Sequence, residues 1–376
     1  MKSLSVAVFL LLPVTALADA PPVPPPPALE AGSWILVDHA SGSVVAGHAV
    51  DQPVEPASLT KLMTAYAVFH ALRDGKLKLD APVAVSEHAW RAEGSRSFID
   101  VGSRVPAEVL LQGMIVQSGN DASIALAEAV AGTEPTFAAL MNQYAERLGM
   151  KASHFENATG LPGANHRVTV ADIARLARAI IREFPDYYRW YSQREFTWNG
   201  ITQGNRNGLL DRDPSVDGMK TGMTESAGYC LVASAKRDGM RLISVVVGTR
   251  SIKAREEASL ALLNYGFSFY ESRRLQTAGA ELARQRIFKA SGGHAAVGIA
   301  EDLVVTLPRG RADRVELKVE PAPKVFAPLT TSDRVGVVRA ILDGKVIAEA
   351  ALQPLADVPL GGIFRRIWDT ILSWFA

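Results

Sequence analysis

The sequence has one cysteine, almost no net charge and no apolar run long enough to cross a membrane. With no second cysteine to pair with, Cys230 excludes an intramolecular disulfide. It lies in the apolar run 229–233, where a buried, inert thiol is expected rather than a nucleophile. A formal net charge of +1 gives no long-range field for nucleic acid, and no basic segment carries interleaved aromatic residues. Nucleic acid is therefore not an expected partner.

Metal-ligand spacing is also missing. The seven histidines, from His39 to His294, form no H-x-x-x-H pair, so we interpret them as scattered surface or structural residues. No metal site and no cofactor are expected. At 376 residues the chain is long enough for two domains, whose cores need neither disulfides nor metal.

The N-terminus has the form of a targeting segment. Lys2 precedes a short apolar stretch that ends before Pro13, and Ala16-Leu17-Ala18 is a small-residue cleavage signal. We predict a signal peptide over residues 1–18 and an exported protein that begins near Asp19. The proline-rich residues 19–30 are predicted to form a stiff, solvated spacer.

Residues 31–270 are predicted to form one α+β domain in which helices cover an antiparallel sheet. Alternating apolar residues predict strands, and apolar residues at helical spacing predict helices. Thr169 and Asp172 have the spacing of a capping box. The strands are expected at 33–38, 42–47, 229–235 and 241–248, and the helices at 56–75, 105–117, 123–130, 172–183 and 255–265.

Two further regions follow. Residues 274–358 contain short alternating segments separated by turns, which predicts a small all-β domain without catalytic groups. Residues 360–376 place two tryptophans and several aliphatic residues on one helical face, and charged residues on the other. This pattern predicts an amphipathic helix in a membrane interface, the alternative being an ordinary helix packed on the β domain.

Ser58-Leu59-Thr60-Lys61 is the first of three short motifs that suggest acyl transfer. Ser58 and Lys61 are three residues apart at a helix start, so their side chains share one face. A serine needs a nearby base to become a good nucleophile, and a lysine is a base only when neutral. Burial, the helix N-terminus and a second lysine, Lys220, are expected to lower the pKa of Lys61.

Ser118-Gly119-Asn120 is the second motif and interrupts a helical region. A loop there can present the Ser118 hydroxyl for proton relay, and the Asn120 amide to hold Lys61 or the substrate. The same residues also suit a simple helix N-cap.

Lys220-Thr221-Gly222 is the third motif and precedes a predicted strand. On an edge strand, a glycine lets another backbone approach closely. A peptide laid along this edge would meet the hydroxyls of Thr221 and Thr224, with a lysine charge for its terminal carboxylate. A plain strand explains this motif alone, but one active site explains all three.

Together with their flanking residues, these motifs resemble the low-molecular-mass penicillin-binding proteins of the D-alanyl-D-alanine carboxypeptidase family, peptidase family S11. The resemblance rests on Glu55-Pro-Ala-Ser-Leu-Thr-Lys-Leu-Met-Thr, Val116-Gln-Ser-Gly-Asn-Asp-Ala, Asn205-Arg-Asn-Gly-Leu-Leu and Val216-Asp-Gly-Met-Lys-Thr-Gly. It covers nearly the whole mature chain. It implies a penicillin-binding/β-lactamase-like domain with a helical subdomain, followed by the all-β domain and an amphipathic anchor, as in periplasmic Gram-negative members.

The resemblance also implies roles for single residues. Ser58 would be the acylated nucleophile and Lys61 its base, while Ser118 and Lys220 would pass a proton to the departing D-alanine with Asn120 orienting. Arg206 and Arg255 would lie at the substrate carboxylate, although a structural ion pair is an alternative for Arg255. The backbone N–H groups of Ser58 and Met223 would form the oxyanion hole. Met223 replaces a histidine of well-known relatives.

The expected activity is removal of the terminal D-alanine from peptidoglycan stem pentapeptides, with penicillins acylating the same serine. The expected partners are those peptides, β-lactams and the inner-membrane surface facing the periplasm. A β-lactamase shares the motifs but needs a deacylating glutamate, and Glu195 to Asn199 has that E-x-x-x-N spacing within a predicted strand. A D,D-endopeptidase and a non-catalytic wall-binding scaffold are two further hypotheses.

Overall fold

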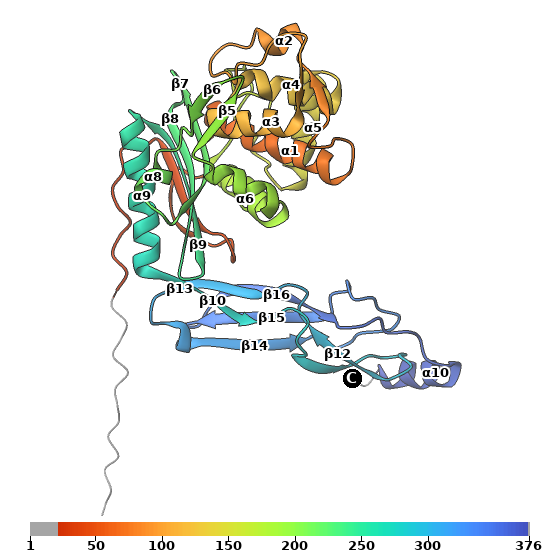
Figure 1. Cartoon of the computed structure of the whole chain (residues 1–376). Helices are drawn as coiled ribbons and strands as arrows, with labels where there is room; N and C mark the ends of the chain where they lie inside the picture. Colours follow the sequence, from red (N-terminus) through yellow and green to blue (C-terminus); the bar gives the residue numbers. More distant parts are fainter. Residues whose placement is uncertain (1–21, 375–376) are drawn as a thin grey trace, which may run out of the picture.

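The computed structural model describes residues 22–374, and the predicted signal peptide lies outside the described residues. Its centre is a five-stranded antiparallel sheet with strand order β2-β1-β9-β8-β7 (Figure 1). The strands are β1 (Ser33–Asp38), β2 (Val44–His48), β7 (Val216–Thr224), β8 (Gly228–Arg237) and β9 (Met240–Thr249). The predicted strands are confirmed, and β7, which carries the third motif, is an edge strand.

Helices cover both faces of this sheet. On β1, Trp34 and Leu36 point into a core with helix α9 (Ile252–Phe269), whereas Ile35 and Val37 point into the core formed with α1 (Lys61–Arg73) and α6 (Val170–Glu183). Such alternation buries successive side chains on opposite faces of a strand. The Thr169 hydroxyl caps α6 by accepting the Asp172 N–H, which is one half of the predicted capping box, whereas the Asp172 carboxylate accepts the Ala152 N–H.

The smaller elements form the helical subdomain beside α1 and the connections around it, and they include one short helix, 209–212, that lies against β7. They are β3 (Pro82–Ala84), α2 (Glu87–Trp90), β4 (Arg104–Pro106), α3 (Ala107–Gln112), α4 (Asn120–Ala131), α5 (Glu134–Arg147), α7 (Pro185–Tyr188), β5 (Glu195–Trp198), β6 (Ile201–Gly204) and α8 (Leu209–Arg212). Helix α5 was not predicted, although Thr133 caps it and Pro135 stands in its first turn.

A second, all-β region follows α9. Strands β10 (Tyr270–Gln276) and β13 (Leu303–Pro308) pair with each other, and five strands form a sheet in the order β11-β12-β16-β15-β14. These five are β11 (Ala283–Arg286), β12 (His294–Gly298), β14 (Val315–Pro321), β15 (Gly336–Leu342) and β16 (Lys345–Pro354). The predicted α+β fold with a C-terminal all-β domain is confirmed.

The N-terminal stretch and the C-terminal helix are the two ends of the described chain. Residues 22–32 have no regular structure, but Val23 and Leu29 pack on the α9 core and Tyr265 donates to the Pro24 carbonyl at 2.9 Å. Most of residues 22–30 are exposed, so the solvated spacer stays a prediction, and these contacts hold parts of it against the α9 core. Helix α10 (Ile363–Leu372) lies at the far end of the β domain (Figure 1). Within residues 22–374, no helix is long and apolar enough to span a membrane.

Candidate active site

Ser58 and Lys61 lie where the chain enters the first long helix. Residues Ala57–Thr60 form a short 3-10 turn, and Lys61 is the first residue of α1. The Nζ of Lys61 lies 3.0 Å from the Ser58 Oγ. Ala57, just before the serine, has φ 47°, a left-handed conformation that costs a residue with a Cβ about 1–3 kcal/mol. The surrounding packing therefore holds the nucleophile in a strained turn.

Two carbonyl oxygens fix the direction of the Lys61 amine. Its Nζ donates to the Asn120 Oδ1 and to the Thr159 backbone carbonyl, both at 2.6 Å. Neither oxygen can donate in return, so a neutral amine must spend its two N–H bonds on them. The remaining lone pair then faces the Ser58 hydroxyl. This arrangement is what a general base for that serine requires.

Burial makes the neutral amine available. Lys61 is 1 % exposed, and this burial, followed by the positive charge of Arg206, lowers its pKa to about 7. The carboxylates of Asp121 and Glu134 act in the opposite direction. The lysine is thus divided between its two protonation states near neutral pH, and burial is the main reason, as expected.

Lys220 is buried to a similar degree beneath the pocket. Burial and the positive charges of Lys61, Arg206 and Arg255 lower the pKa of Lys220 well below its ordinary value. The like charges of the two lysines repel each other, so the pair is more stable when one of the two amines is neutral. The expectation that Lys220 lowers the pKa of Lys61 stays a prediction, and Arg206 is a further positive charge that lowers the pKa of Lys61.

The second motif forms a sharp break between two helices. Residues Gly113–Gln117 form a π-helical turn, Ser118 has φ 69°, and α4 begins at Asn120. No side chain of the motif caps α4, so the N-cap interpretation is not supported. The Ser118 Oγ is buried and has no hydrogen-bond partner among residues 22–374. Ser118 is one of the residues that line the pocket, and its hydroxyl is unpaired there.

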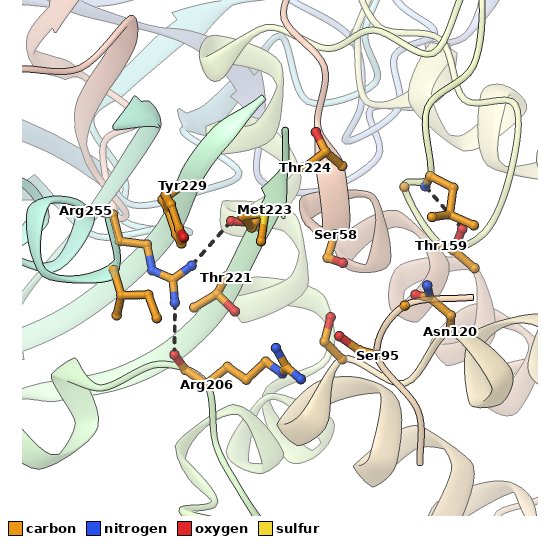
Figure 2. Close-up of a pocket in the computed structure, with 16 residues that line it drawn as sticks. Ser58, Ser95, Asn120, Thr159, Arg206, Thr221, Met223, Thr224, Tyr229 and Arg255 are labelled. Atoms are coloured by element: carbon orange, nitrogen blue, oxygen red, sulfur yellow. Dashed lines mark hydrogen bonds between the residues drawn. The ribbon is translucent and has the colours of Figure 1, made fainter. Parts of the chain in front are cut away.

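The loop before α4 is held tightly over this break. The buried Asp121 carboxylate accepts the Ser97 N–H at 2.8 Å, and the Ser95 carbonyl accepts the Asn120 N–H at 2.7 Å. A Cβ on Gly119 would stand 2.0 Å from the Ser97 Oγ. The glycine therefore permits the close approach that puts Ser95 beside Asn120 (Figure 2).

Strand β7 approaches the nucleophile through Gly222. A Cβ at this position would lie 3.3 Å from the Ser58 backbone N and 3.2 Å from the Pro56 carbonyl. This close approach of the edge strand is what the motif predicted. It brings the backbone after Gly222 next to the Ser58 N–H. The Met223 side chain is 55 % exposed and points away from the core.

Arg206 and Arg255 differ in their use of hydrogen bonds. The Arg206 Nε donates to the Gln117 carbonyl at 3.0 Å, and its side chain reaches across the pocket toward Ser95 (Figure 2). Arg255 is buried and donates to the carbonyls of Gly222 and Arg206, each at 3.3 Å. Arg255 therefore links the β7 backbone to the Arg206 loop through these two hydrogen bonds, rather than through a short ion pair.

One cavity of about 500 Å³ collects these groups. Nine of the eleven residues singled out in the sequence line it, while Lys61 and Lys220 lie just beneath. The nine are Ser58, Ser118, Asn120, Arg206, Thr221, Gly222, Met223, Thr224 and Arg255. No group of histidine, cysteine or acidic residues suited to a metal occurs in the described part of the chain.

Sequence reasoning missed the wall formed by residues 157–161. The Asn157 Oδ1 accepts the N–H groups of Thr159 and Gly160, an Asx-type turn that aims the Thr159 carbonyl at Lys61. Gly160 has φ 88° and packs directly against the Ala57 backbone. The Asn-x-Thr-Gly order signals a turn, but nothing in it indicates a lysine 98 residues away.

Comparison with known proteins identifies relatives of this architecture. Residues 20–251 match the family described as D-alanyl-D-alanine carboxypeptidase, and residues 270–360 match the penicillin-binding protein 5 C-terminal domain. The D-alanyl-D-alanine carboxypeptidase DacA of Haemophilus influenzae is 41 % identical over 353 residues, which cover 92 % of this chain and 90 % of that protein.

Solved structures agree with the sequence comparison. Penicillin binding protein 5 from Haemophilus influenzae superposes with a TM-score of 0.84 at 40 % identity, covering 89 % of this chain and 99 % of that one. Penicillin-Binding Protein D2 from Listeria monocytogenes, in its ampicillin-bound form, has a TM-score of 0.57 at 29 % identity. It covers 65 % of this chain and 100 % of its own.

Proposed function

Because the chain belongs to the D-alanyl-D-alanine carboxypeptidase family, we propose that it removes the terminal D-alanine from peptidoglycan stem pentapeptides through an acyl-enzyme on Ser58. The observation that carries the assignment is the Lys61 amine. Two carbonyl acceptors and a pKa of about 7 leave its lone pair directed at the Ser58 hydroxyl.

Acylation follows from this geometry. Lys61 takes the hydroxyl proton as the Ser58 Oγ bonds to the carbonyl carbon of the penultimate D-alanine. The backbone N–H groups of Ser58 and Met223 stabilise the oxyanion. Collapse breaks the peptide bond, and the proton that Lys61 took from Ser58 passes through Ser118 and Lys220 to the departing amine, which leaves Lys61 neutral again. Water then hydrolyses the ester and restores the Ser58 hydroxyl.

We assign the orientation of the substrate to an arginine and two threonines that line one wall of the pocket. Arg206 extends a guanidinium into the cavity, and the hydroxyls of Thr221 and Thr224 line the same strand. A guanidinium fork and hydroxyl donors suit a terminal carboxylate. Arg255 supports this group by holding the backbone of Arg206 and Gly222. Since Met223 contributes a backbone donor, the loss of the relatives' histidine leaves the oxyanion hole intact.

The central experiment combines two assays on Ser58→Ala. Mass spectrometry should show a penicilloyl adduct on the wild type and none on the variant, and D-alanine release from a pentapeptide should disappear. Retention of both activities by the variant would overturn the assignment. A Ser192→Ala variant, whose exposed hydroxyl only bonds the Arg189 carbonyl, is a matched control.

A β-lactamase would need a positioned base that this pocket lacks. Glu195 is exposed on β5 and does not line the 500 Å³ cavity, so its spacing to Asn199 is coincidental. We therefore expect a penicilloyl-enzyme that persists for minutes or longer, and a lifetime of milliseconds would favour a β-lactamase. A D,D-endopeptidase differs only in substrate, which parallel assays with a pentapeptide and a cross-linked dimer distinguish.

We also propose that the protein is exported and binds the outer face of the inner membrane through α10. The support is the orientation of this helix. Asp369, on its polar face, is 1 % exposed and accepts the Lys289 N–H at 2.6 Å. Phe364 and Trp368, on its apolar face, are 87 % and 62 % exposed, and Trp374, just after the helix, is 74 % exposed. An ordinary packed helix would have the opposite orientation.

Deletion of residues 361–376 tests the anchor. The truncated protein should leave the membrane fraction and keep its activity on soluble pentapeptide, because the cavity lies in the other domain. Continued sedimentation with membranes would contradict the proposal. Thr370→Ala on the same helix is the control, because it leaves the apolar face unchanged and should not release the protein.

A further inference from the structure

His166 is a buried histidine that the acyl-transfer chemistry described above does not use. It is 1 % exposed and does not line the catalytic cavity. Both of its ring nitrogens nevertheless have polar partners: Nε2 lies 3.0 Å from the Thr60 Oγ1, and Nδ1 lies 3.2 Å from the Asn157 Nδ2. Thr60 directly precedes Lys61 in the chain. The imidazole therefore lies between the start of the catalytic helix and the turn that begins at Asn157.

The protonation state of His166 follows from the orientation of Asn157. The Asn157 Oδ1 accepts the N–H groups of Thr159 and Gly160, so the amide nitrogen is the atom that faces the imidazole. An amide nitrogen only donates, so the Nδ1 of His166 accepts and carries no proton. The Nε2 then carries the proton of a neutral ring and donates to Thr60. Burial, which lowers the pKa of His166 to about 4, keeps the ring neutral around pH 7.

The direction of the Thr159 carbonyl depends on the turn that Asn157 forms. The Lys61 amine donates to this carbonyl at 2.6 Å. The turn exists because the Asn157 Oδ1 is directed at backbone N–H groups, while its Nδ2 donates to the imidazole and to the Leu161 carbonyl. Rotation of the amide would break all of these bonds. The imidazole of His166 is therefore part of what keeps the turn in shape.

Packing alone does not explain a histidine at this position. Its ring packs edge-to-face on Phe155, with the ring centroids 5.8 Å apart, and an apolar ring would make this contact equally well. An apolar ring would offer no partner to the buried Thr60 hydroxyl or to the Asn157 amide, and unpaired buried polar groups are costly. Hydrogen bonding is thus what distinguishes this imidazole.

We propose that His166 is a positioning residue for the general base, because its two ring nitrogens hold the Asn157 turn against the start of α1. The turn keeps the Thr159 carbonyl on one N–H of Lys61, and the lone pair of the amine then faces Ser58. Without His166 the turn can shift, and an amine whose lone pair points elsewhere accepts the Ser58 proton more slowly. The inference rests on the proposed function, in which Lys61 is the base.

Two substitutions separate the hydrogen bonds from the shape of the ring. His166→Gln keeps one acceptor for Asn157 and one donor for Thr60, whereas His166→Phe keeps a ring and has neither. Stopped-flow measurement with a fluorescent penicillin gives two constants, the dissociation constant before the bond forms and the rate constant of acylation. His166→Phe should lower the rate constant about tenfold and leave the dissociation constant within about twofold, because the side chain lies outside the cavity. His166→Gln should recover the rate constant to within about threefold of the wild type.

The pattern across these variants decides the proposal. Equal rate constants in the wild type and in His166→Phe would overturn it. An equal loss in both variants would overturn it as well, because the ring nitrogens would then not be responsible. His154→Phe is the matched control, because it replaces a nearby exposed histidine outside the catalytic cavity, and both constants should stay unchanged.

Nitrogen NMR on the wild type tests the same assignment directly. The His166 ring signals, identified by their absence from His166→Gln, should be those of a neutral ring protonated at Nε2 from pH 5 to pH 8. An Nδ1–H tautomer in that range would overturn the proposal. If the wild type formed no penicilloyl adduct and released no D-alanine, the proposed function would fail, whereas the tautomer would still show whether His166 accepts from Asn157. Normal acylation in both His166 variants would reject the positioning role alone.

Discussion

The rate at which penicillin acylates Ser58 should depend steeply on pH around neutrality. Lys61 is a base only when neutral, and its pKa is lowered to about 7 by burial and by Arg206. The neutral fraction therefore rises from about one tenth at pH 6 to about nine tenths at pH 8. An ordinary lysine, with a pKa near 10.5, would be almost fully protonated over this whole range.

Stopped-flow measurement of acylation by a fluorescent penicillin gives this profile directly. The second-order rate constant should increase about tenfold from pH 6 to pH 8 and level off above pH 8. Arg206→Gln removes a positive neighbour, so the midpoint should move to higher pH whatever happens to affinity. Arg189→Gln is the charge-matched control, because it removes an exposed arginine outside the cavity and should leave the midpoint in place.

Two results would refute the reasoning. A profile that is flat between pH 6 and pH 8 would mean that Lys61 does not accept the proton. A midpoint near pH 10 would mean that burial does not lower the pKa of this amine. An unchanged midpoint in Arg206→Gln would mean that Arg206 does not lower the pKa of Lys61, and burial would remain as the cause.

Three further changes test other parts of the structure. Gly222→Ala should slow acylation about tenfold or more, because the added Cβ would press on the Pro56 and Ser58 backbone. The thermal unfolding temperature should shift by only a few degrees. A normal acylation rate would show that β7 can move away from Ser58 at this position. Asp369→Ala should leave pentapeptide cleavage unchanged but expose α10 to trypsin, since the buried carboxylate holds the helix on the β domain; equal protection would contradict that role. Glu195→Gln should not change the lifetime of the penicilloyl-enzyme, because the side chain is exposed outside the cavity; a longer lifetime would make Glu195 a deacylating base.

The sequence was sufficient where a local pattern determines the structure. Alternation predicted β1, β8 and β9, and the Lys-Thr-Gly motif predicted an edge strand that approaches the serine through its glycine. The Ser-Gly-Asn break was predicted because three small polar residues interrupt a helical pattern. These features depend on residues close together in the chain.

Contacts between distant segments were beyond prediction. The Thr159 carbonyl accepts a hydrogen bond from Lys61 although the two residues are far apart in the chain. Because every residue has a backbone carbonyl, the residue type at this position does not indicate the contact. The relative charge states of Lys61, Lys220 and Arg206 depend on burial and spacing, which no motif encodes. Val23 and Leu29 pack on the α9 core, a contact that the proline-rich composition of residues 19–30 does not indicate.

The β domain lies between the catalytic domain and α10, and side-chain hydrogen bonds are found at both of its ends (Figure 1). At one end, the Ser41 hydroxyl contacts that of Thr306 at 2.6 Å; at the other, Asp369 holds the helix. If α10 rests on lipid, the domain fixes the height of the pocket above the bilayer. Such an enzyme would trim only the peptides that hang at that height, so distance from the membrane becomes part of its substrate selection.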